Sequence, residues 1–250
     1  MNGVGQPACF DPATEVYEDV PSYKASEKTS HLTDVVEGHD GRLYMPSFPA
    51  GKLVAFDRDT GDYQEYPVGK KNHQLYAACL TDSGLIGILN GLQHGVYTLD
   101  PRVGEVKLES PSQIVGRSDA YSAFLRCGDQ VLITVGHPEG GIEICRFSAL
   151  DLAFLSSFVI TPAISSGRNL MLGPNGCPYL SLDDGHIYPL DLELETAEPA
   201  YQIPRIPSRG VYYFLDNNRI LFAGHSQYYG IYDIRTGTFD PHRTEIENPP

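Results

Sequence analysis

The chain has 250 residues, the length of one large all-β domain or of two smaller domains. Hydrophobic residues make up 41% of it, which is enough for a sizeable core and excludes an intrinsically disordered chain. The formal net charge of -14 disfavours binding to nucleic acids and to anionic membrane surfaces, because both repel a negatively charged protein.

We expect neither a leader nor a membrane anchor. The N-terminal residues lack a basic stretch followed by an apolar one, and no window approaches the roughly 18 apolar residues that a membrane span needs. The five cysteines form no C-x-x-C pair. We therefore expect a cytoplasmic protein whose cysteines are buried free thiols in a reducing compartment.

In chain order, residues 1–30 predict a hairpin ribbon, because GVGQPACFDPATEVYED contains two short strand patterns around a Pro-bearing turn. A repeat of about 44 residues then begins, and this period is typical of propellers. Its clearest copy runs from Gly41 to Gly69 and holds a strand, a turn, a second strand ending in Asp, a Gly-bearing hairpin and a further strand. The same pattern returns in four later stretches: 85–109, 130–158, 178–203 and 219–244.

One position closes the third strand of each unit and sets the register of the repeat. It is occupied by Asp11, Asp57, Asp100, Ser148, Asp191 and Asp233. An Asp followed by Pro or by a Gly-containing tetrapeptide predicts a tight hairpin, in which the carboxylate accepts backbone N–H groups and Gly supplies a positive φ.

Short strands, frequent turns and no helical periodicity predict an all-β fold: a sandwich, a barrel or a propeller. The repeat of about 44 residues with four strands selects a β-propeller of five to six four-stranded antiparallel blades. We expect one β-propeller domain over residues 1–250, with the N-terminal hairpin ribbon at 1–30 and five full blades over 31–250. We expect the ribbon to pair with a neighbouring blade, because an open sheet edge is a liability. A β-sandwich is the alternative fold. Five blades plus a ribbon, six blades with one incomplete, and a truncated chain all remain open.

The segments Gly41–Gly61, Gly84–Gly104 and Arg219–Gly237 carry a pattern of the form G-x-L-Y … K-L-V-A-F-D-x-x-T-G. In this they resemble the lactonase and strictosidine-synthase-like propellers and the virginiamycin-B-lyase-like propellers. The resemblance implies a central funnel that binds small molecules, often with a divalent cation at its base. The lactonase metal ligands have no counterpart here, because Glu37 lies several residues too late. We therefore predict no cofactor, with a divalent cation as the alternative.

Five connections that lead into the first strand of successive units carry a nitrogenous side chain at a similar offset: His31, His73, Arg117, Arg168 and Arg209. In a propeller such connections open onto one face around the axis. Two imidazoles and three guanidiniums at one mouth would bind a carboxylate, phosphate or enolate. The alternative is that these are ordinary polar loop residues that pair with the acidic surface.

Two further groups extend this candidate site. Tyr76, Tyr121 and Tyr212 follow the cationic positions and are expected to line the funnel, with strand packing as the alternative. Turn histidines, among them His137 and His225, are expected either to form a rim or to be solvated. Their spacing does not fit a zinc site.

We therefore expect a small-molecule enzyme, a lyase, cyclase or hydrolase that acts on an anionic or carbonyl-bearing substrate. His73 and His31 are the candidate catalytic residues. The candidate substrate-binding residues are Arg117, Arg168, Arg209, Tyr76, Tyr121, Tyr212, His137 and His225. Neither nucleic acid nor membrane is expected as a partner, and the oligomeric state is left open. The alternative is a non-catalytic propeller that binds protein or sugar.

Overall fold

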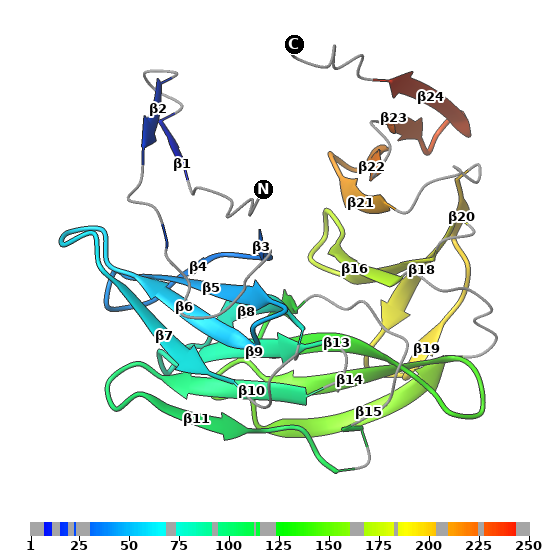
Figure 1. Ribbon diagram of the computed structural model, residues 1–250. Coiled ribbons are helices and arrows are strands. Elements are labelled where there is room, and N and C mark those ends of the chain that lie inside the picture. The colour runs from blue at the N-terminus through cyan, green and yellow to red at the C-terminus, as the bar shows by residue number, and fades with distance from the viewer. Residues whose placement is uncertain are drawn as a thin grey trace. The chain divides into compact units, whose positions relative to one another are not determined.

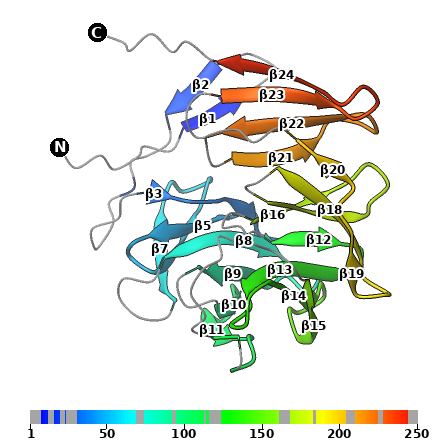
Figure 2. The same cartoon turned by 90° about the vertical axis from the view of Figure 1, so that its right-hand side faces the viewer.

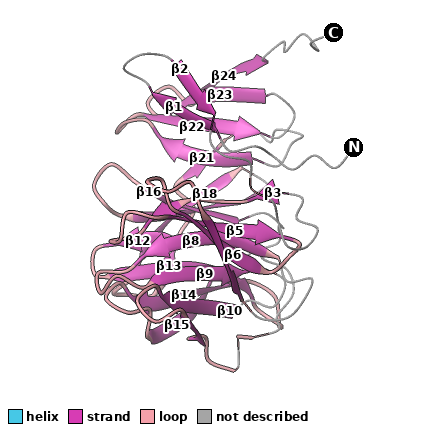
Figure 3. Ribbon diagram, turned by 60° about the vertical axis from the view of Figure 1, so that its left-hand side comes forward, coloured by secondary structure: helices cyan, strands magenta, loops and turns pink. Residues whose placement is uncertain are grey.

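A computed structural model of the chain contains strands and loops and no helix over the residues that it describes (Figure 3). Those residues are 8–11, 16–19, 23, 31–68, 74–91, 95–112, 114–115, 124–160, 168–182, 185–203, 210–224 and 228–243. The chain divides into two compact units. The first comprises residues 1–118 and 150–154, and the second comprises residues 119–149 and 155–250.

The first unit opens with a two-stranded ribbon, β1 (Ala8–Asp11) and β2 (Val16–Asp19), which pair antiparallel with each other (Figure 1). Among the described strands neither one pairs with any other sheet. The predicted hairpin is therefore present, and its pairing with a neighbouring blade stays a prediction. The two strands satisfy each other along their full four-residue length.

Two further antiparallel sheets complete the first unit (Figure 1). Sheet 1 is formed by β3 (His31–Leu32), β4 (Val36–Glu37), β5 (Leu43–Phe48), β6 (Lys52–Phe56) and β7 (Tyr63–Pro67). Because β3 and β4 both pair with β5, they are successive parts of one first strand. Sheet 2 is formed by β8 (Leu75–Leu80), β9 (Ile86–Asn90), β10 (Gly95–Asp100) and β11 (Glu105–Leu108).

The second unit holds three sheets of the same kind, and the strands of the last one lie side by side in chain order (Figure 2). Sheet 3 is formed by β12 (Leu125–Cys127), β13 (Gln130–Gly136), β14 (Ile142–Ser148) and β15 (Phe154–Ile160). Sheet 4 is formed by β16 (Arg168–Leu172), β17 (Pro178–Leu182), β18 (His186–Asp191), β19 (Thr196–Ala197) and β20 (Tyr201–Gln202). Sheet 5 is formed by β21 (Gly210–Phe214), β22 (Arg219–Gly224), β23 (Tyr228–Asp233) and β24 (Thr238–Arg243).

In sheet 4 both β19 and β20 pair with β18, so they share the place of the fourth strand. Each of the five sheets is therefore a four-stranded antiparallel meander, in which consecutive strands are neighbours. This is the blade of a β-propeller, and the predicted fold class is confirmed. The described part of the chain holds five such blades and the separate ribbon. The assignment of residues 1–250 to one domain stays a prediction.

The central strands are buried on both faces, and period-2 alternation sends their side chains into two different cores. In β6, Leu53 and Ala55 join a cluster with Leu75 and Ile88 of sheet 2, whereas Val54 and Phe56 face the opposite side. Full burial of one such aliphatic side chain stabilises the fold by about 1.5–3 kcal/mol. In the second unit the corresponding clusters lie between sheets 3 and 4 and between sheets 4 and 5.

The turn after the third strand has the predicted chemistry. Asp57 Oδ1 accepts hydrogen bonds from the backbone N–H groups of Asp59 (3.0 Å) and Thr60 (3.2 Å). Gly61, at φ 75°, donates its N–H to the Asp57 carbonyl at 2.9 Å. The same carboxylate-to-backbone bonding recurs in three other sheets, at Asp100, Asp191 and Asp233. The Asp residues that close the third strands of these four sheets thus cap the turns that follow them.

The cysteines depart from the expectation of burial. Of the four whose state the structure describes, Cys145 is buried, Cys79 and Cys127 are half-buried and Cys177 is exposed, and none of the four is in a disulfide. Cys177 lies in the turn before β17, where the chain is on the surface rather than in a sheet. The prediction of buried thiols is therefore wrong for Cys177.

Candidate functional site

Two of the five predicted cationic residues lie on described backbone. His31 is the first residue of β3 and pairs with Phe48, and Arg168 is the first residue of β16 and pairs with Leu182. Each therefore begins the first strand of its sheet, the place that the sequence assigns to it. His73, Arg117 and Arg209 lie outside the described residues. Because His31 and Arg168 belong to different units, the convergence of the five side chains stays a prediction.

An aromatic pair lies beside the His31 backbone in the first unit. Tyr76 sits in an irregular step of β8, between Leu75 and Ala77, where the register shifts as in a β-bulge. Its ring stacks on Phe48 with centroids 6.4 Å apart, and its hydroxyl bonds to the Gln74 side chain. A bulge turns a side chain away from the regular alternation. Tyr76 is consequently half-buried between two fully packed neighbours, Leu75 and Ala77.

Gly91 gives the Tyr76 ring its room. A Cβ atom on Gly91 would lie 1.8 Å from Tyr76 Cδ2, far closer than two non-bonded carbon atoms can approach. Gly91 also donates its N–H to the Gln74 carbonyl at 2.9 Å, so the backbone holds the ring and its hydroxyl partner in one place. The ring and hydroxyl form an amphipathic surface of the kind that small-molecule sites use.

The sequence interpretation missed a set of small polar side chains buried in the second strands. They are Ser47, Asn90, Thr134 and Ser181, at exposures of 0%, 0%, 1% and 1%. Three lie next to the start of a first strand in the register: Ser47 opposite Leu32, Asn90 opposite Leu75 and Ser181 opposite Asn169. A buried polar group costs free energy unless it is hydrogen-bonded. The Ser47 hydroxyl offsets this cost, because it donates to the Lys52 carbonyl oxygen and accepts from the Lys52 N–H. The signal in the sequence is one polar residue in an otherwise apolar strand, as in GILN and YLSL.

Asp34, close to His31 in sequence, has a structural role. Its Oδ1 accepts from the Val35 N–H at 2.8 Å and its Oδ2 accepts from the Ala78 N–H at 2.9 Å. The neighbouring Thr33 hydroxyl donates to the Leu75 carbonyl at 2.8 Å. These bonds join the first strand of sheet 1 to the first strand of sheet 2.

Two other predicted residues take structural places. Tyr212 is 5% exposed and packs against Phe222, with ring centroids 5.1 Å apart, in the core between sheets 4 and 5. The regular register of β21 points it into that core, so the expectation that it lines a funnel gives way to strand packing. His137 is half-buried in a turn, where its Nδ1 accepts from the Glu139 N–H at 3.4 Å. Tyr121 and His225 lie outside the described residues.

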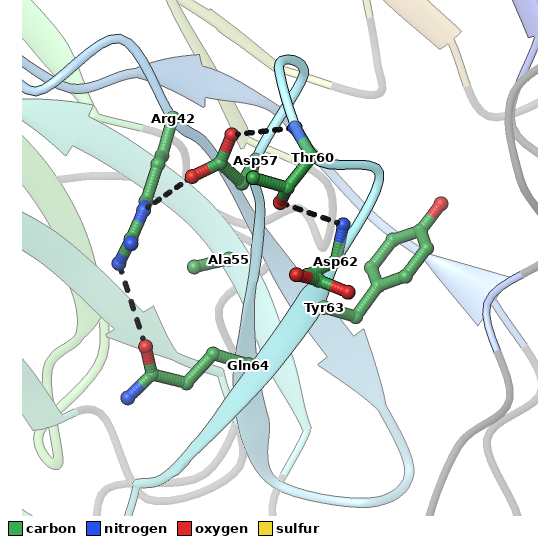
Figure 4. Close-up of a pocket in the computed structure, with 7 residues that line it drawn as sticks. All are labelled: Arg42, Ala55, Asp57, Thr60, Asp62, Tyr63 and Gln64. Atoms are coloured by element: carbon green, nitrogen blue, oxygen red, sulfur yellow. Dashed lines mark hydrogen bonds and ion pairs between the residues drawn. The ribbon is translucent and has the colours of Figure 1, made fainter.

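The first unit also has a cavity of about 340 Å³ at the outer hairpin of sheet 1 (Figure 4). Arg42 lines it and contacts Asp57 Oδ2 and Gln64 Oε1, each at 3.4 Å. The Thr60 and Asp59 N–H groups, with Arg42, hold the pKa of Asp57 below its ordinary value. Arg42 and Asp57 thus satisfy each other, and none of the described residues that line the cavity belongs to a first strand.

A second cavity, of about 250 Å³, is lined by Thr98, Lys107 and four carboxylates: Asp100, Glu105, Glu109 and Asp151. Lys107 Nζ contacts Glu109 Oε2 at 2.9 Å, and Glu109 raises the pKa of this lysine. The remaining charge is negative, the wrong sign for the predicted anionic substrate.

Within the described ranges, no three or more His, Cys, Asp or Glu side chains gather as a metal site would require. In the same ranges, no helix has the length and apolarity to cross a membrane.

No family model and no curated protein sequence matches the chain. Solved structures do match it. A virginiamycin B lyase from Staphylococcus aureus has 12% sequence identity and a TM-score of 0.73, covering 99% of this chain and 80% of the lyase chain. A streptogramin B lyase has 14% identity and a TM-score of 0.72, covering 98% of this chain and 78% of the lyase chain. A catalytically inactive His-to-Ala variant of the S. aureus lyase, solved with quinupristin, has 13% identity and a TM-score of 0.74, covering 98% and 80%. The resemblance to virginiamycin-B-lyase-like propellers is therefore confirmed at the level of the fold.

Proposed function

We propose that this protein is a small-molecule lyase whose site is formed where the chain enters the first strand of each blade. The observation that carries the proposal is the likeness over almost the whole chain to solved lyases, at TM-scores of 0.72 to 0.74. One of these neighbours is a variant made catalytically inactive by replacing a histidine with alanine, with quinupristin bound. A histidine that is essential in a neighbour supports a catalytic histidine here.

In the proposed site, His73 is the general base and His31 is the second titratable group. Arg117, Arg168 and Arg209 bind the anionic or carbonyl group of the substrate, since guanidinium groups offer paired donors to such oxygens. Tyr76 and Tyr121 form the amphipathic wall. The proposal gives no role to a metal.

The chemistry follows from these groups. His73 takes a proton from the carbon next to a carbonyl, and the arginines stabilise the enolate oxygen that develops. The electron pair then forms a carbon–carbon double bond as the leaving group departs from the adjacent carbon. The leaving group finally receives a proton from the imidazolium. No water is consumed, and this distinguishes the reaction from hydrolysis.

Quinupristin is the first compound to test, by mass spectrometry and ultraviolet absorbance. A lyase forms a new double bond, and its products together have the mass of the substrate, whereas a hydrolase adds one water. His73→Ala should lower kcat by about 10²-fold or more. Arg117→Ala should raise KM. His39→Ala, an exposed histidine in the turn between β4 and β5, is the matched control and should leave both unchanged.

Unchanged turnover and unchanged ligand affinity in both His73→Ala and Arg117→Ala would remove the proposal. Binding of quinupristin without any turnover would support the non-catalytic alternative. We also propose a cytoplasmic location, because none of the four cysteines whose state is described is in a disulfide. Fractionation of cells that express the tagged chain tests this.

A further inference from the structure

Two cysteines from neighbouring sheets of the second unit approach each other. Cys127 ends β12 of sheet 3, and Cys177 directly precedes β17 of sheet 4. The Cys127 thiol donates to the Gly176 carbonyl oxygen at 3.5 Å. Because that carbonyl carbon is bonded to the nitrogen of Cys177, standard backbone geometry puts the Cys127 sulfur within roughly 6 Å of the Cys177 Cα. Because each sulfur lies only two bonds from its own Cα atom, rotation about the Cα–Cβ bonds can bring the two sulfur atoms together. The disulfide itself requires the two Cα atoms to be about 4.4–6.8 Å apart.

Both cysteines flank the turn between a first and a second strand, and these turns are held in place. In the turn before β17, Gly173 donates its N–H to the Cys177 carbonyl at 2.8 Å, and Gly176 donates its N–H to the Gly173 carbonyl at 3.0 Å. The turn after β12 contains Gly128 at φ 61°. The backbone of the two turns therefore holds the two cysteines near each other.

The contact belongs to the repeat rather than to this pair alone. In the first unit the corresponding turns of sheets 1 and 2 also touch, where a Cβ atom on Gly84 would lie 3.0 Å from His39 Nδ1. A histidine and a glycine cannot be cross-linked in this way. Among the described residues, the turns of sheets 3 and 4 are the pair in which both sides carry a thiol.

The two thiols differ in their surroundings. Cys177 is exposed, whereas Cys127 is half-buried. Burial, with smaller contributions from Cys177 and Asp129, raises the pKa of the Cys127 thiol. Since the thiolate is the reactive form, Cys177 is the residue that reacts first with an external disulfide and Cys127 is the one that follows.

We propose that Cys127 and Cys177 are a reversible redox pair that forms a disulfide by exchange with glutathione disulfide. The Cys177 thiolate attacks one sulfur of glutathione disulfide, which forms a mixed disulfide and releases one glutathione thiolate. The Cys127 thiolate then attacks the Cys177 sulfur and releases the second glutathione. The protein loses two protons and two electrons, and one glutathione disulfide becomes two glutathiones.

The redox pair is separate from the proposed lyase site. Arg168 begins β16, which spans about 13 Å at the usual rise per residue, and Cys177 lies beyond the other end of that strand. The inference therefore does not rest on the proposed function. Its consequence is mechanical, because the disulfide would tie the first strand of sheet 3 to the turn of sheet 4.

The test incubates the full chain with glutathione disulfide, quenches remaining thiols with iodoacetamide and maps the peptides without reduction. We expect a peptide linked through Cys127 and Cys177, a mass lower by two hydrogens, and a Tm that rises by roughly 5 °C and returns on reduction. Cys127→Ser and Cys177→Ser should each abolish the linked peptide and the Tm shift. Cys177→Ser should also abolish glutathione labelling at this site.

Two outcomes would overturn the proposal. One is a stable glutathione adduct on Cys177 while Cys127 is still alkylated by iodoacetamide. The other is an oxidised protein whose linked peptides join other cysteines or two different chains. Peptide mapping of the unaltered chain gives this answer even if a serine variant folds poorly.

Discussion

Leu152 and Glu195 occupy the same place in two different turns, four residues after the position that closes the third strand. Both have left-handed backbone, at φ 59° and 54°, whereas the other three sheets have glycine at this place: Gly61, Gly104 and Gly237. A left-handed conformation costs a non-glycine residue about 1–2 kcal/mol. The turn geometry of the repeat is thus kept in sheets 3 and 4 against the preference of the residue.

Replacing Glu195 by glycine should stabilise the protein. Glu195→Gly removes the backbone strain, adds some entropy to the unfolded chain and loses a contact with Arg146 at 3.5 Å. This ion pair is partly exposed and is worth little. We expect a gain of about 0.5–1 kcal/mol, measured as a higher Tm. The matched control is Glu193→Gly in the same turn, which has no strain to relieve and should lower the Tm. A lower Tm for both variants would contradict the strain argument.

Replacing Leu152 by glycine should instead destabilise the protein. Leu152 is 0% exposed, and its Cδ1 occupies the space that a Cβ on Gly87 would need, at 2.4 Å from that position. Leu152→Gly relieves the strain but removes a buried side chain and leaves a cavity, so we expect a net loss of about 2–3 kcal/mol. Thermal unfolding of Leu152→Gly and Leu152→Ala separates the two effects, because alanine keeps the strain and loses most of the packing. Leu152→Ala should be the less stable of the two.

The turn chemistry was predictable because it depends on neighbours in the sequence. Asp57 and Gly61 define a turn through contacts within five residues, and the repeat then follows from their recurrence. The neighbouring sequence could not tell which of Tyr76 and Tyr212 is half-buried and which lies in the core. A one-residue irregularity in β8 leaves Tyr76 half-buried, whereas the unbroken register of β21 sends Tyr212 into the core. Such an irregularity is set by packing between strands, which a single sequence does not reveal.

The capped turns should make the protein sensitive to acid. Backbone N–H groups of Thr60 and Asp59, with Arg42, lower the pKa of Asp57, and the Arg102 side chain and backbone N–H lower that of Asp100. A carboxyl whose folded pKa lies below its unfolded value stabilises the protein above the unfolded pKa and loses this effect as the pH falls through the folded one. Stability should therefore be flat from neutral pH to about pH 5 and decline below about pH 4.

Asp57→Asn tests the origin of that decline. Asparagine keeps a side-chain oxygen for the Asp59 and Thr60 N–H groups but has no proton to gain, so the variant should show a shallower fall in Tm between about pH 4 and pH 2. Glu193→Gln, an exposed carboxyl in the turn of sheet 4, serves as the comparison and should keep the original slope. An Asp57→Asn curve parallel to that of the unaltered chain would mean that other carboxyls control the acid response.

The aromatic pair beside the proposed site should depend on the missing side chain at position 91. Gly91→Ala would place a methyl group 1.8 Å from Tyr76 Cδ2 and 1.9 Å from Cε2, so the Tyr76 ring must leave its stack on Phe48. We expect a loss of about 1–3 kcal/mol in stability and a weaker affinity for any ligand that the ring contacts. The double variant Gly91→Ala with Tyr76→Ala should recover part of the stability lost by Gly91→Ala, because the clash is then absent. A double-mutant cycle on the free energy of unfolding measures this coupling, and strictly additive effects would show that the ring and Gly91 do not constrain each other.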